Sequence, residues 1–427
     1  MPFKRVCSFL FGLLIAGVLI APPAVALDLR TAIGKALAAD PRLPAGDLEV
    51  EATRGGVEQA GKYPNPEASV EVENFGGTGD YSGFGNSEVT LGVQQKLERG
   101  GKRSARIEAA RGKENVANAE IAILRREIIA QTKIDFVRVL GAMSTVETMS
   151  RSVKRLEGLV PQLEKRVEAG GSLKADLARG KLAAGRARVA LEKARIDLKA
   201  AKAQLVANWS GSPSDARDVA GRLHHDSHKP VAVAELLPLL NQHPAIRSWD
   251  AVYAERAGDV SVQHSLAVPD VMLGAGMRRL SERDDTAFVI TGSIPLPVHD
   301  RNEGNIVSSQ ARLDKVRFER EGARRALQRR LIEAHGEMEA ECLESQRLFE
   351  VVVPQGRSAA DDVQSSFDQG RLTVKDLLDG YGAQLEVETL QIEADTRCHT
   401  AAAKVETLVA RKPWQTGWEP VSEGNGE

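Results

Sequence analysis

Apolar residues recur at steps of three and four over two long stretches in the first half of the chain. This is the heptad spacing of a left-handed coiled coil, so the sequence predicts two long helices that pack together after a turn at Gly170-Gly171. A helix unbroken from Lys102 to Ala169 would be about 100 Å long at a rise of 1.5 Å per residue, and Pro161 would bend it. The recurring residues are Val146, Met149, Val153, Leu156, Val160, Leu163 and Val167 before the turn, and Ala187, Leu191, Ala194, Leu198, Ala201 and Leu205 after it.

Four shorter segments read as strands, and apolar and polar residues alternate most clearly in the first and fourth of them. Ala68, Val70 and Val72, for example, are each followed by a polar residue, which is typical of a strand with one apolar and one polar face. We expect strands at about 66–76, 86–97, 269–279 and 286–296, lengths that suit strands crossing a bilayer. The pattern alone leaves open a soluble sheet of two hairpins on a helical stalk.

Residues of the first half recur about 200 positions later, so the chain consists of two copies of one unit: helix, strand, loop, strand, and a long helix that turns back into another. Pro161 and Pro354 depart from this offset, which indicates that one copy gained or lost two helical turns. We expect a first repeat at 27–208, a connector at 209–231, a second repeat at 232–411 and a polar tail at 412–427. The matching pairs are Pro41 and Pro244, Gly55 and Gly258, Val57 and Val260, and Pro66 and Pro269 at an offset of 203, then Gly170 and Gly370, and Asp176 and Asp376, at an offset of 200.

The first 26 residues have the pattern of a signal peptide. Lys4 and Arg5 precede an apolar run from Val6 to Ile20, and Ala24-Val25-Ala26 fits a signal-peptidase site. Loss of the two cations changes the formal net charge from −2 to −4, which excludes a basic nucleic-acid-binding surface.

No later segment has 18 consecutive apolar residues, so no membrane-spanning helix is expected after residue 26. Only a closed β-barrel would make the chain an integral membrane protein. Four strands are too few to close a barrel, and open sheet edges are not tolerated in lipid. Three chains would pool twelve strands, a number within the range of known outer-membrane barrels.

Three motifs carry a resemblance to a known family. Tyr63-Pro64-Asn65-Pro66-Glu67 precedes the first strand, Leu97-Glu98-Arg99-Gly100-Gly101-Lys102-Arg103 follows the second, and Ile294-Pro295-Leu296-Pro297-Val298-His299-Asp300-Arg301-Asn302-Glu303-Gly304-Asn305-Ile306 follows the fourth. They resemble the TolC-type outer-membrane efflux family, and within it the heavy-metal, CzcC-like branch. The likeness covers the mature chain as far as about Pro413.

The resemblance implies a mainly α fold with a membrane β-barrel: a homotrimer with a 12-stranded barrel in the outer membrane, continued through the periplasm by a barrel of α-helices. It implies the exit duct of a tripartite efflux system of the RND heavy-metal type. The partners would be outer-membrane lipid, a periplasmic adaptor (membrane fusion protein) and an inner-membrane RND pump. Such a duct is passive, opens when the adaptor docks and uses no cofactor; the chain also lacks the motifs of an enzyme.

The resemblance further assigns the periplasmic tip. Asp376 and Asp379 correspond in position to aspartates that narrow the pore, and their spacing places both on one helix face; an ordinary solvated face is the alternative. The first repeat has Arg179 at the second of these positions. Phe367 and Leu372 stand where TolC has a tyrosine and an arginine that lock the entrance, so the same hydrogen-bonded lock is excluded. The residues expected to dock the adaptor are Gly170, Gly171, Leu173, Gly370, Leu372 and Thr373.

Each crossing from strand to helix must turn sharply, and glycine permits backbone angles that other residues avoid. This applies to Gly100, Gly101 and Gly304. The residues expected to form the turns are Gly100, Gly101, Asp300, Arg301, Asn302 and Gly304.

Cys342 and Cys398 are each 28 residues from Gly370, so they lie level if the helices fold back there. Each also continues an apolar stripe along its helix. The periplasm favours oxidation and seam-facing cysteines can be close enough to bond but need not be, so the sequence leaves open a possible disulfide and two buried free thiols.

His224-His225-Asp226-Ser227-His228 is the most metal-like cluster, but a solvated connector loop is the simpler interpretation, and no metal site is predicted. Two other functions remain open. One is an outer-membrane factor for drug or protein export, since the pump selects the cargo. The other is a periplasmic adaptor or structural coiled coil, which would not need four amphipathic strands.

Overall fold

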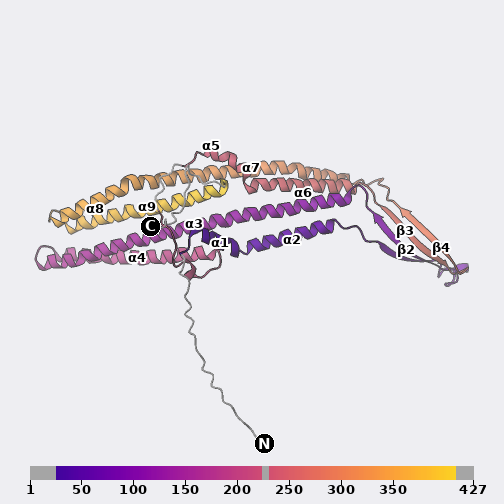
Figure 1. The fold of residues 1–427 in the computed structure, drawn as a ribbon, viewed down its shortest axis with the longest axis horizontal. Helices are drawn as coiled ribbons and strands as arrows, with labels where there is room; N and C mark the ends of the chain where they lie inside the picture. Colours follow the sequence, from indigo (N-terminus) through magenta and orange to yellow (C-terminus); the bar gives the residue numbers. More distant parts are fainter. Residues whose placement is uncertain (1–25, 224–229, 410–427) are drawn as a thin grey trace, which may run out of the picture.

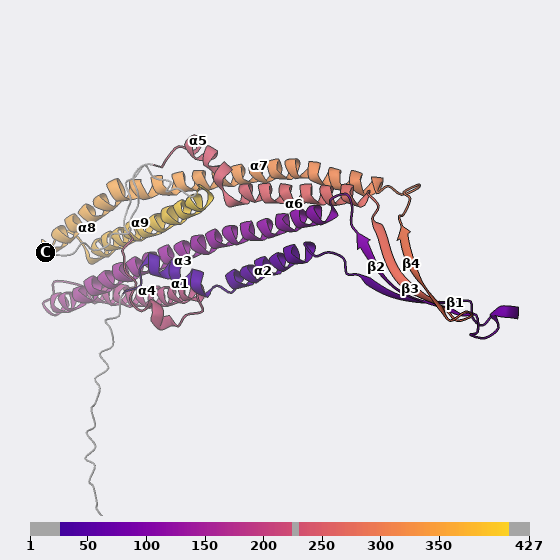
Figure 2. The same cartoon turned by 45° about the vertical axis from the view of Figure 1, so that its right-hand side comes forward.

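The computed structural model describes residues 26–223 and 230–409. Long helices lie side by side and a four-stranded sheet extends from one end of them (Figures 1 and 2). The turns between α3 and α4 and between α8 and α9 lie at the opposite end. The α-helices are α1 (Leu29–Ala39), α2 (Arg42–Ala60), α3 (Lys102–Glu168), α4 (Lys174–Ala207), α5 (Val233–Leu236), α6 (Pro244–Leu266), α7 (Glu303–Arg347), α8 (Val353–Asp368) and α9 (Val374–Val409), and the strands are β1 (Glu67–Glu73), β2 (Glu88–Leu97), β3 (Val271–Leu280) and β4 (Asp285–Ser293). Short 3-10 helices are η1 (Gly79–Tyr81), η2 (Pro213–Ala216) and η3 (Leu237–Gln242), and η4 (Leu348–Val352) is a π-helix.

The two repeats have helical arms of nearly equal length, so the expected gain or loss of two turns is wrong. In the first repeat α3 has 67 residues and continues through Pro161. In the second, α7, η4 and α8 together run from Glu303 to Asp368, one residue fewer. The two prolines lie at different distances along the chain from the turn that ends their arm. Pro354 lacks the N–H that would continue the helical ladder, and the π-helix η4 directly precedes it.

The sheet has the order β1-β2-β3-β4 with antiparallel neighbours, and its register separates two faces. On one face apolar residues line up across every strand: Val70, Leu91, Met277 and Phe288 lie in one row, and Ala68, Val93, Ala275 and Ile290 in another. On the other face, the row next to that of Val70 holds Glu71, Thr90, Arg278 and Ala287. Phe288 and Ile290 are 86% and 87% exposed, so none of the residues that the structure describes covers the apolar face there.

Within residues 26–223 and 230–409, no helix combines the length and apolar character needed to cross a bilayer.

Two apolar clusters hold the helices together midway along the arms. One packs α1 against α3 and α4 around Phe136 and Leu205. The other packs η3 against α7 and α9 around Leu331 and Met338. The heptad stripe of the first repeat is buried further along, at Val153 and its neighbours on α4.

Small residues allow α6 to lie directly against α3. A Cβ added to Gly258 on α6 would stand 2.5 Å from the Cα of Ala109, and one added to Gly112 on α3 would stand 2.4 Å from the Cα of Glu255. A larger side chain at either glycine would force the helices apart. α6 also contacts α7, so it lies between the long helices of the two repeats.

Candidate functional site

Each helical hairpin ends in a turn that a glycine closes. Gly170 and Gly370 have φ angles of 74° and 73°, in the left-handed region that strains other residues. The N–H of Gly171 donates to the carbonyl of Arg166 at 2.8 Å, and the N–H of Arg371 donates to the carbonyl of Ser366 at 2.9 Å. This six-residue closure satisfies carbonyls that the helix end leaves unpaired.

Asp376 stabilises the start of α9. Its carboxylate accepts hydrogen bonds from the Thr373 N–H at 2.9 Å and the Thr373 hydroxyl at 2.6 Å, and the Thr373 Oγ1 accepts from the Asp376 N–H at 3.3 Å. This is a capping box. The bond from the Thr373 hydroxyl is the main reason that the pKa of Asp376 is lowered. In the first repeat Asp176 accepts from the Leu173 N–H at 3.3 Å, so the duplicated aspartate caps a helix in both hairpins.

Asp379 takes no part in this cap. It is exposed and borders a groove of about 460 Å³ between α4 and α9, together with Arg179 and Arg186. Arg179 forms an ion pair with Asp176 at 3.3 Å. The charge of Asp379 can therefore be changed without disturbing the turn.

Phe367 and Leu372 belong to an apolar cluster that joins the two hairpins near their tips. Phe367 is 2% exposed and lies in one cluster with Leu159 and Leu163 of α3. The guanidinium of Arg166 lies 4.3 Å from the centre of its ring. Packing and a cation–π contact thus hold the hairpins together here.

A polar network joins the same hairpins further from the tip. Arg155 on α3 donates to the Gln384 Oε1 at 2.5 Å and stacks over the Tyr381 ring at 4.7 Å. Glu388 on α9 forms ion pairs with Arg357 of α8 at 2.9 Å and with Arg151 of α3 at 3.6 Å. These side chains line a cavity of about 350 Å³.

Burial and ion pairing act in opposite directions on Glu388. Burial raises its pKa, but the hydrogen bonds from Arg357 and Gln384 and the charges of Arg357 and Arg151 lower it, and the pKa is below the ordinary glutamate value. Burial raises the pKa of Tyr381, so the phenol stays protonated and donates to Gln364. At neutral pH the network therefore holds the Glu388 carboxylate between Arg357 and Arg151.

The network around Glu388 is not among the sites predicted from the sequence. The available signal was the spacing of four residues between Arg151 and Arg155 and between Gln384 and Glu388, which places each pair on one helix face. The sequence does not show that these two faces meet, because they belong to different repeats.

Known proteins resemble the chain over most of its length. A sequence model of the outer membrane efflux protein family matches residues 32–211. The cobalt-zinc-cadmium resistance protein CzcC of Cupriavidus metallidurans is 28% identical over 386 residues, which cover 90% of each protein. The nickel and cobalt resistance protein CnrC of the same organism is 28% identical over 68% of this chain and 70% of its own. The outer membrane protein VceC from Vibrio cholerae shares the fold, with a TM-score of 0.71 at 19% identity over 89% of this chain and 95% of that chain.

The chain is similar to the outer membrane efflux protein family over residues 32–211 and to CzcC over most of its length. It is an efflux channel of the outer membrane that extends into the periplasm, a conduit and not an enzyme. The resemblance inferred from the sequence motifs is confirmed, as is a mainly helical fold with a small antiparallel four-stranded sheet. Channels of this family serve tripartite pumps, which supply an adaptor and an inner-membrane partner.

The turns from strand to helix in this channel protein depart from the expectation at one position. Gly100 and Gly101 have φ angles of 69° and 72°, as their glycine identity allows. In the second repeat the left-handed residue is Asn302, with φ of 63°, while Gly304 lies in the first turn of α7 and needs no special angle. Asparagine tolerates this conformation, and the Asn302 Nδ2 donates to the Gln263 carbonyl at 2.7 Å.

Asp300 and Arg301 support the same turn. The Asp300 carboxylate accepts from the Asn302 N–H at 2.8 Å, and the Arg301 Nε donates to the Pro297 carbonyl at 3.3 Å. These contacts are local, so both residues shape the turn itself.

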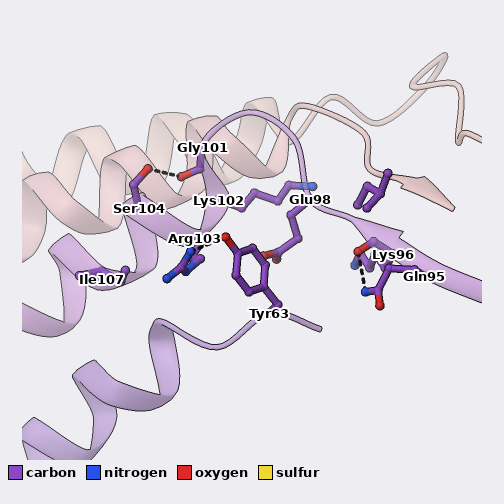
Figure 3. Close-up of a pocket in the computed structure, with 10 residues that line it drawn as sticks. Tyr63, Gln95, Lys96, Glu98, Gly101, Lys102, Arg103, Ser104 and Ile107 are labelled. Carbon is purple, nitrogen blue, oxygen red and sulfur yellow. Dashed lines mark hydrogen bonds between the residues drawn. The ribbon is translucent and has the colours of Figure 1, made fainter. Parts of the chain in front are cut away.

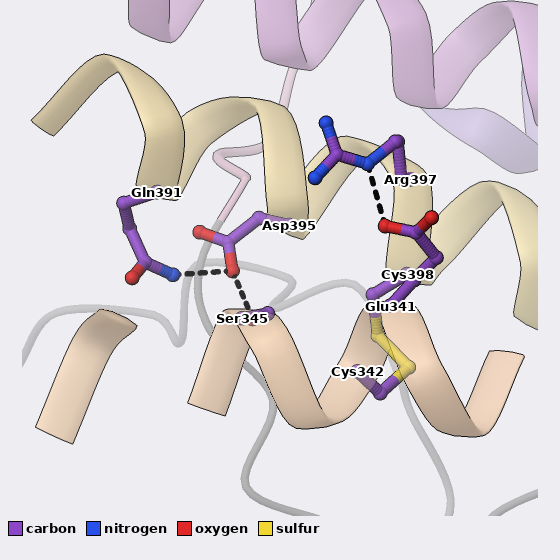
Figure 4. The surroundings of a disulfide bond; sticks show 7 residues. All are labelled: Glu341, Cys342, Ser345, Gln391, Asp395, Arg397 and Cys398. Atoms are coloured by element: carbon purple, nitrogen blue, oxygen red, sulfur yellow. Dashed lines mark hydrogen bonds and ion pairs between the residues drawn. A yellow bond between two sulfur atoms is a disulfide. The ribbon is translucent and has the colours of Figure 1, made fainter. Parts of the chain in front are cut away.

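A disulfide joins Cys342 on α7 to Cys398 on α9, with the Cα atoms 4.7 Å apart. Figure 4 shows polar contacts beside it: the Gln391 side chain donates to Asp395 at 2.7 Å, and Ser345 donates to the same carboxylate. The bond lies within the apolar cluster around Met338 and just before η4 along the chain. It therefore ties the long arm of the second repeat to α9 before the arm continues to the tip.

In the part of the channel that the structure describes, no group of three His, Cys, Asp or Glu side chains could hold a metal ion. The cluster His224-His225-Asp226-Ser227-His228 lies outside the described residues.

Proposed function

We propose that this channel is the exit duct of a tripartite efflux system that expels divalent heavy-metal cations. The observation that carries the proposal is the junction of helical arms, about 100 Å long at 1.5 Å per residue, with a sheet that has one apolar and one polar face. Such a sheet suits contact with lipid on one side and a hydrated pore on the other. The metal class is supported by relatives named for resistance to cobalt, zinc, cadmium and nickel.

The proposed working form is a homotrimer. β1 and β4 are the sheet edges, and unpaired edges are unfavourable in lipid, so β4 of one chain would pair with β1 of the next and twelve strands would close the sheet. The repeat supports a matching helical interface. Gly258 seats α6 against α3, whereas its counterpart Gly55 on α2 faces open space, so Gly55 would seat α2 against α7 of the next chain.

The proposed entrance lies at the tips of the hairpins. The cluster around Phe367 and the network around Glu388 hold α8 and α9 against α3, and their separation would open the pore. The adaptor would dock at the turns, where Leu173 is 71% exposed, along with Gly170, Gly171, Gly370, Leu372 and Thr373. Asp376 and Asp379 from three chains would form a ring that favours cations.

Growth of a deletion strain tests the cargo. Expression of the channel should restore tolerance to cobalt, zinc and cadmium, and cross-linking of the outer-membrane fraction should yield a trimer. A strain that loses drug tolerance and keeps metal tolerance would assign the channel to drug export instead.

A further inference from the structure

A pocket of about 700 Å³ lies where β2 passes into α3 (Figure 3). Tyr63, from the segment between α2 and β1, forms one wall, and Arg103, from the first turn of α3, reaches toward its hydroxyl. The remaining lining comes from the end of β2 and the turn that follows it, and includes Lys96, Leu97, Glu98 and Lys102.

Positive charge exceeds negative charge around this pocket. Lys96 and Lys102 share one carboxylate, Asp270, at 3.1 and 2.6 Å. Arg106 forms a two-point ion pair with Glu98, and the hydrogen bond from Arg106 lowers the pKa of Glu98, so that this carboxylate is ionised at neutral pH. With Arg103, four cations face two carboxylates.

Within residues 26–223 and 230–409, Arg103 forms no ion pair with a carboxylate. Its Nε donates to the Gly61 carbonyl at 2.7 Å and its Nη1 donates to the Tyr63 hydroxyl at 2.6 Å. The guanidinium also lies 4.3 Å from the centre of the Tyr63 ring. Both partners are neutral, so they fix the direction of the guanidinium and leave its full charge for a ligand.

The position of the pocket at the end of the sheet favours a lipid as its ligand. The pocket lies where β2 ends, and the exposed apolar residues of this strand include Leu91, Val93 and Leu97. The side chain of Tyr63 is itself 71% exposed. Tyrosine and basic residues are typical of the boundary between hydrocarbon and water. Leu97 and Ile107 add an apolar part to the lining.

The second repeat does not build this pocket. Gly101 and Asn302 are the left-handed caps that precede α3 and α7, so Glu303 and Gly304 stand where the first repeat has Lys102 and Arg103. Leu266 stands in place of Tyr63 at the offset of 203 that relates Pro66 to Pro269. Each chain therefore carries one such site.

We infer that this pocket binds the phosphate of an anionic phospholipid from the inner leaflet of the outer membrane, with Arg103 as the phosphate ligand and Tyr63 beside the glycerol. The inference rests on the proposed placement of the sheet in the membrane. A diacyl lipid fits better than free phosphate, because the pocket adjoins the apolar face of β2. The amine of a zwitterionic phosphatidylethanolamine would meet the excess of positive charge.

Native mass spectrometry of the purified trimer, titrated with phosphatidylglycerol or phosphatidylethanolamine, tests the site. We expect about one phosphatidylglycerol per chain, bound more tightly than phosphatidylethanolamine. Arg103→Gln should weaken phosphatidylglycerol binding roughly tenfold, the change expected on loss of one charge-assisted hydrogen bond, and Arg103→Lys should restore part of it. Arg301→Gln, which removes an exposed arginine from the equivalent turn of the second repeat, is the matched control.

Equal binding of the two lipids, or an equal loss in both glutamine variants, would overturn the inference, because either result means that general surface charge is responsible. Displacement of the lipid by inorganic phosphate at equal concentration would instead assign the pocket to free phosphate. The proposed duct is judged separately by trimer formation and conductance, which Arg103→Gln should leave unchanged.

Discussion

Gly258 on α6 lies so close to Ala109 on α3 that an added Cβ would stand 2.5 Å from the Ala109 Cα. Its repeat counterpart, Gly55 on α2, has no atom within 4 Å of the same added position. Two equivalent glycines thus have different surroundings in a single chain. The difference disappears if a helix of a second chain packs on Gly55 of α2 in the way that α3 packs on Gly258 of α6.

Leucine at these two glycines should therefore have different effects. Gly258→Leu should disrupt the fold of the chain itself, because the contact is with backbone atoms that cannot move aside. Gly55→Leu should leave the helical content of the chain intact and prevent trimer formation. Circular dichroism and cross-linking in detergent separate the two outcomes.

Gly34→Leu on the exposed side of α1 is the control, since an added Cβ there also meets nothing within 4 Å. A stable Gly55→Leu trimer would contradict the proposed interface.

The periodic parts of this fold could be read from the sequence, because each pattern has one structural consequence. The alternation around Val70 and the heptads around Val153 predicted the strands and the long helices. The alignment of Pro161 with Pro354 misled, since a proline at a different level need not change the length of a helix. Gly304 misled for a similar reason: the identity of a residue permits a left-handed angle, but the hydrogen bond from Asn302 to Gln263 decides where that angle falls.

Removing the disulfide should destabilise the second repeat. Replacing both Cys342 and Cys398 by alanine should lower the free energy of unfolding by about 2 to 4 kcal/mol, because the bond restricts the unfolded chain. Thermal unfolding with and without a reducing agent measures the change, and the double variant should be insensitive to the agent. Thiol titration of the denatured, unreduced mature protein should find no free thiol; two per chain would refute the bond in the protein as exported.

Asp379 should affect the cation selectivity of the pore without affecting the cap at the start of α9. Asp379→Asn should lower the cation selectivity of the reconstituted pore without changing the thermal stability of the tip, since Asp379 is exposed and makes no cap contact. Asp376→Ala should lower both, because it also removes the acceptor for Thr373. Planar-bilayer reversal potentials report selectivity. Unchanged selectivity in both variants would show that these carboxylates face away from the pore.

Glu388 should make the entrance sensitive to acid. Its pKa in the folded channel is below the ordinary glutamate value of 4.5, so the ion pairs with Arg357 and Arg151 are complete above about that pH and are lost as the pH falls through the lowered pKa. The raised pKa of Tyr381 keeps its phenol protonated in acid. Glu388 is the buried carboxylate of this network, with a side chain 12% exposed, whereas Glu147, the other partner of Arg151, is 67% exposed.

We expect the reconstituted channel to open more often as the pH falls below about 4.5, the ordinary glutamate pKa. Glu388→Gln should open more often than the wild type at neutral pH and lose most of the acid response, because the ion pairs of Glu388 with Arg357 and Arg151 are then absent. Glu192→Gln is the control, since Glu192 pairs with Arg195 on the exposed face of α4. Single-channel recording between pH 7 and pH 4 decides the matter. An acid response that survives in Glu388→Gln would mean that another carboxylate holds the hairpins together.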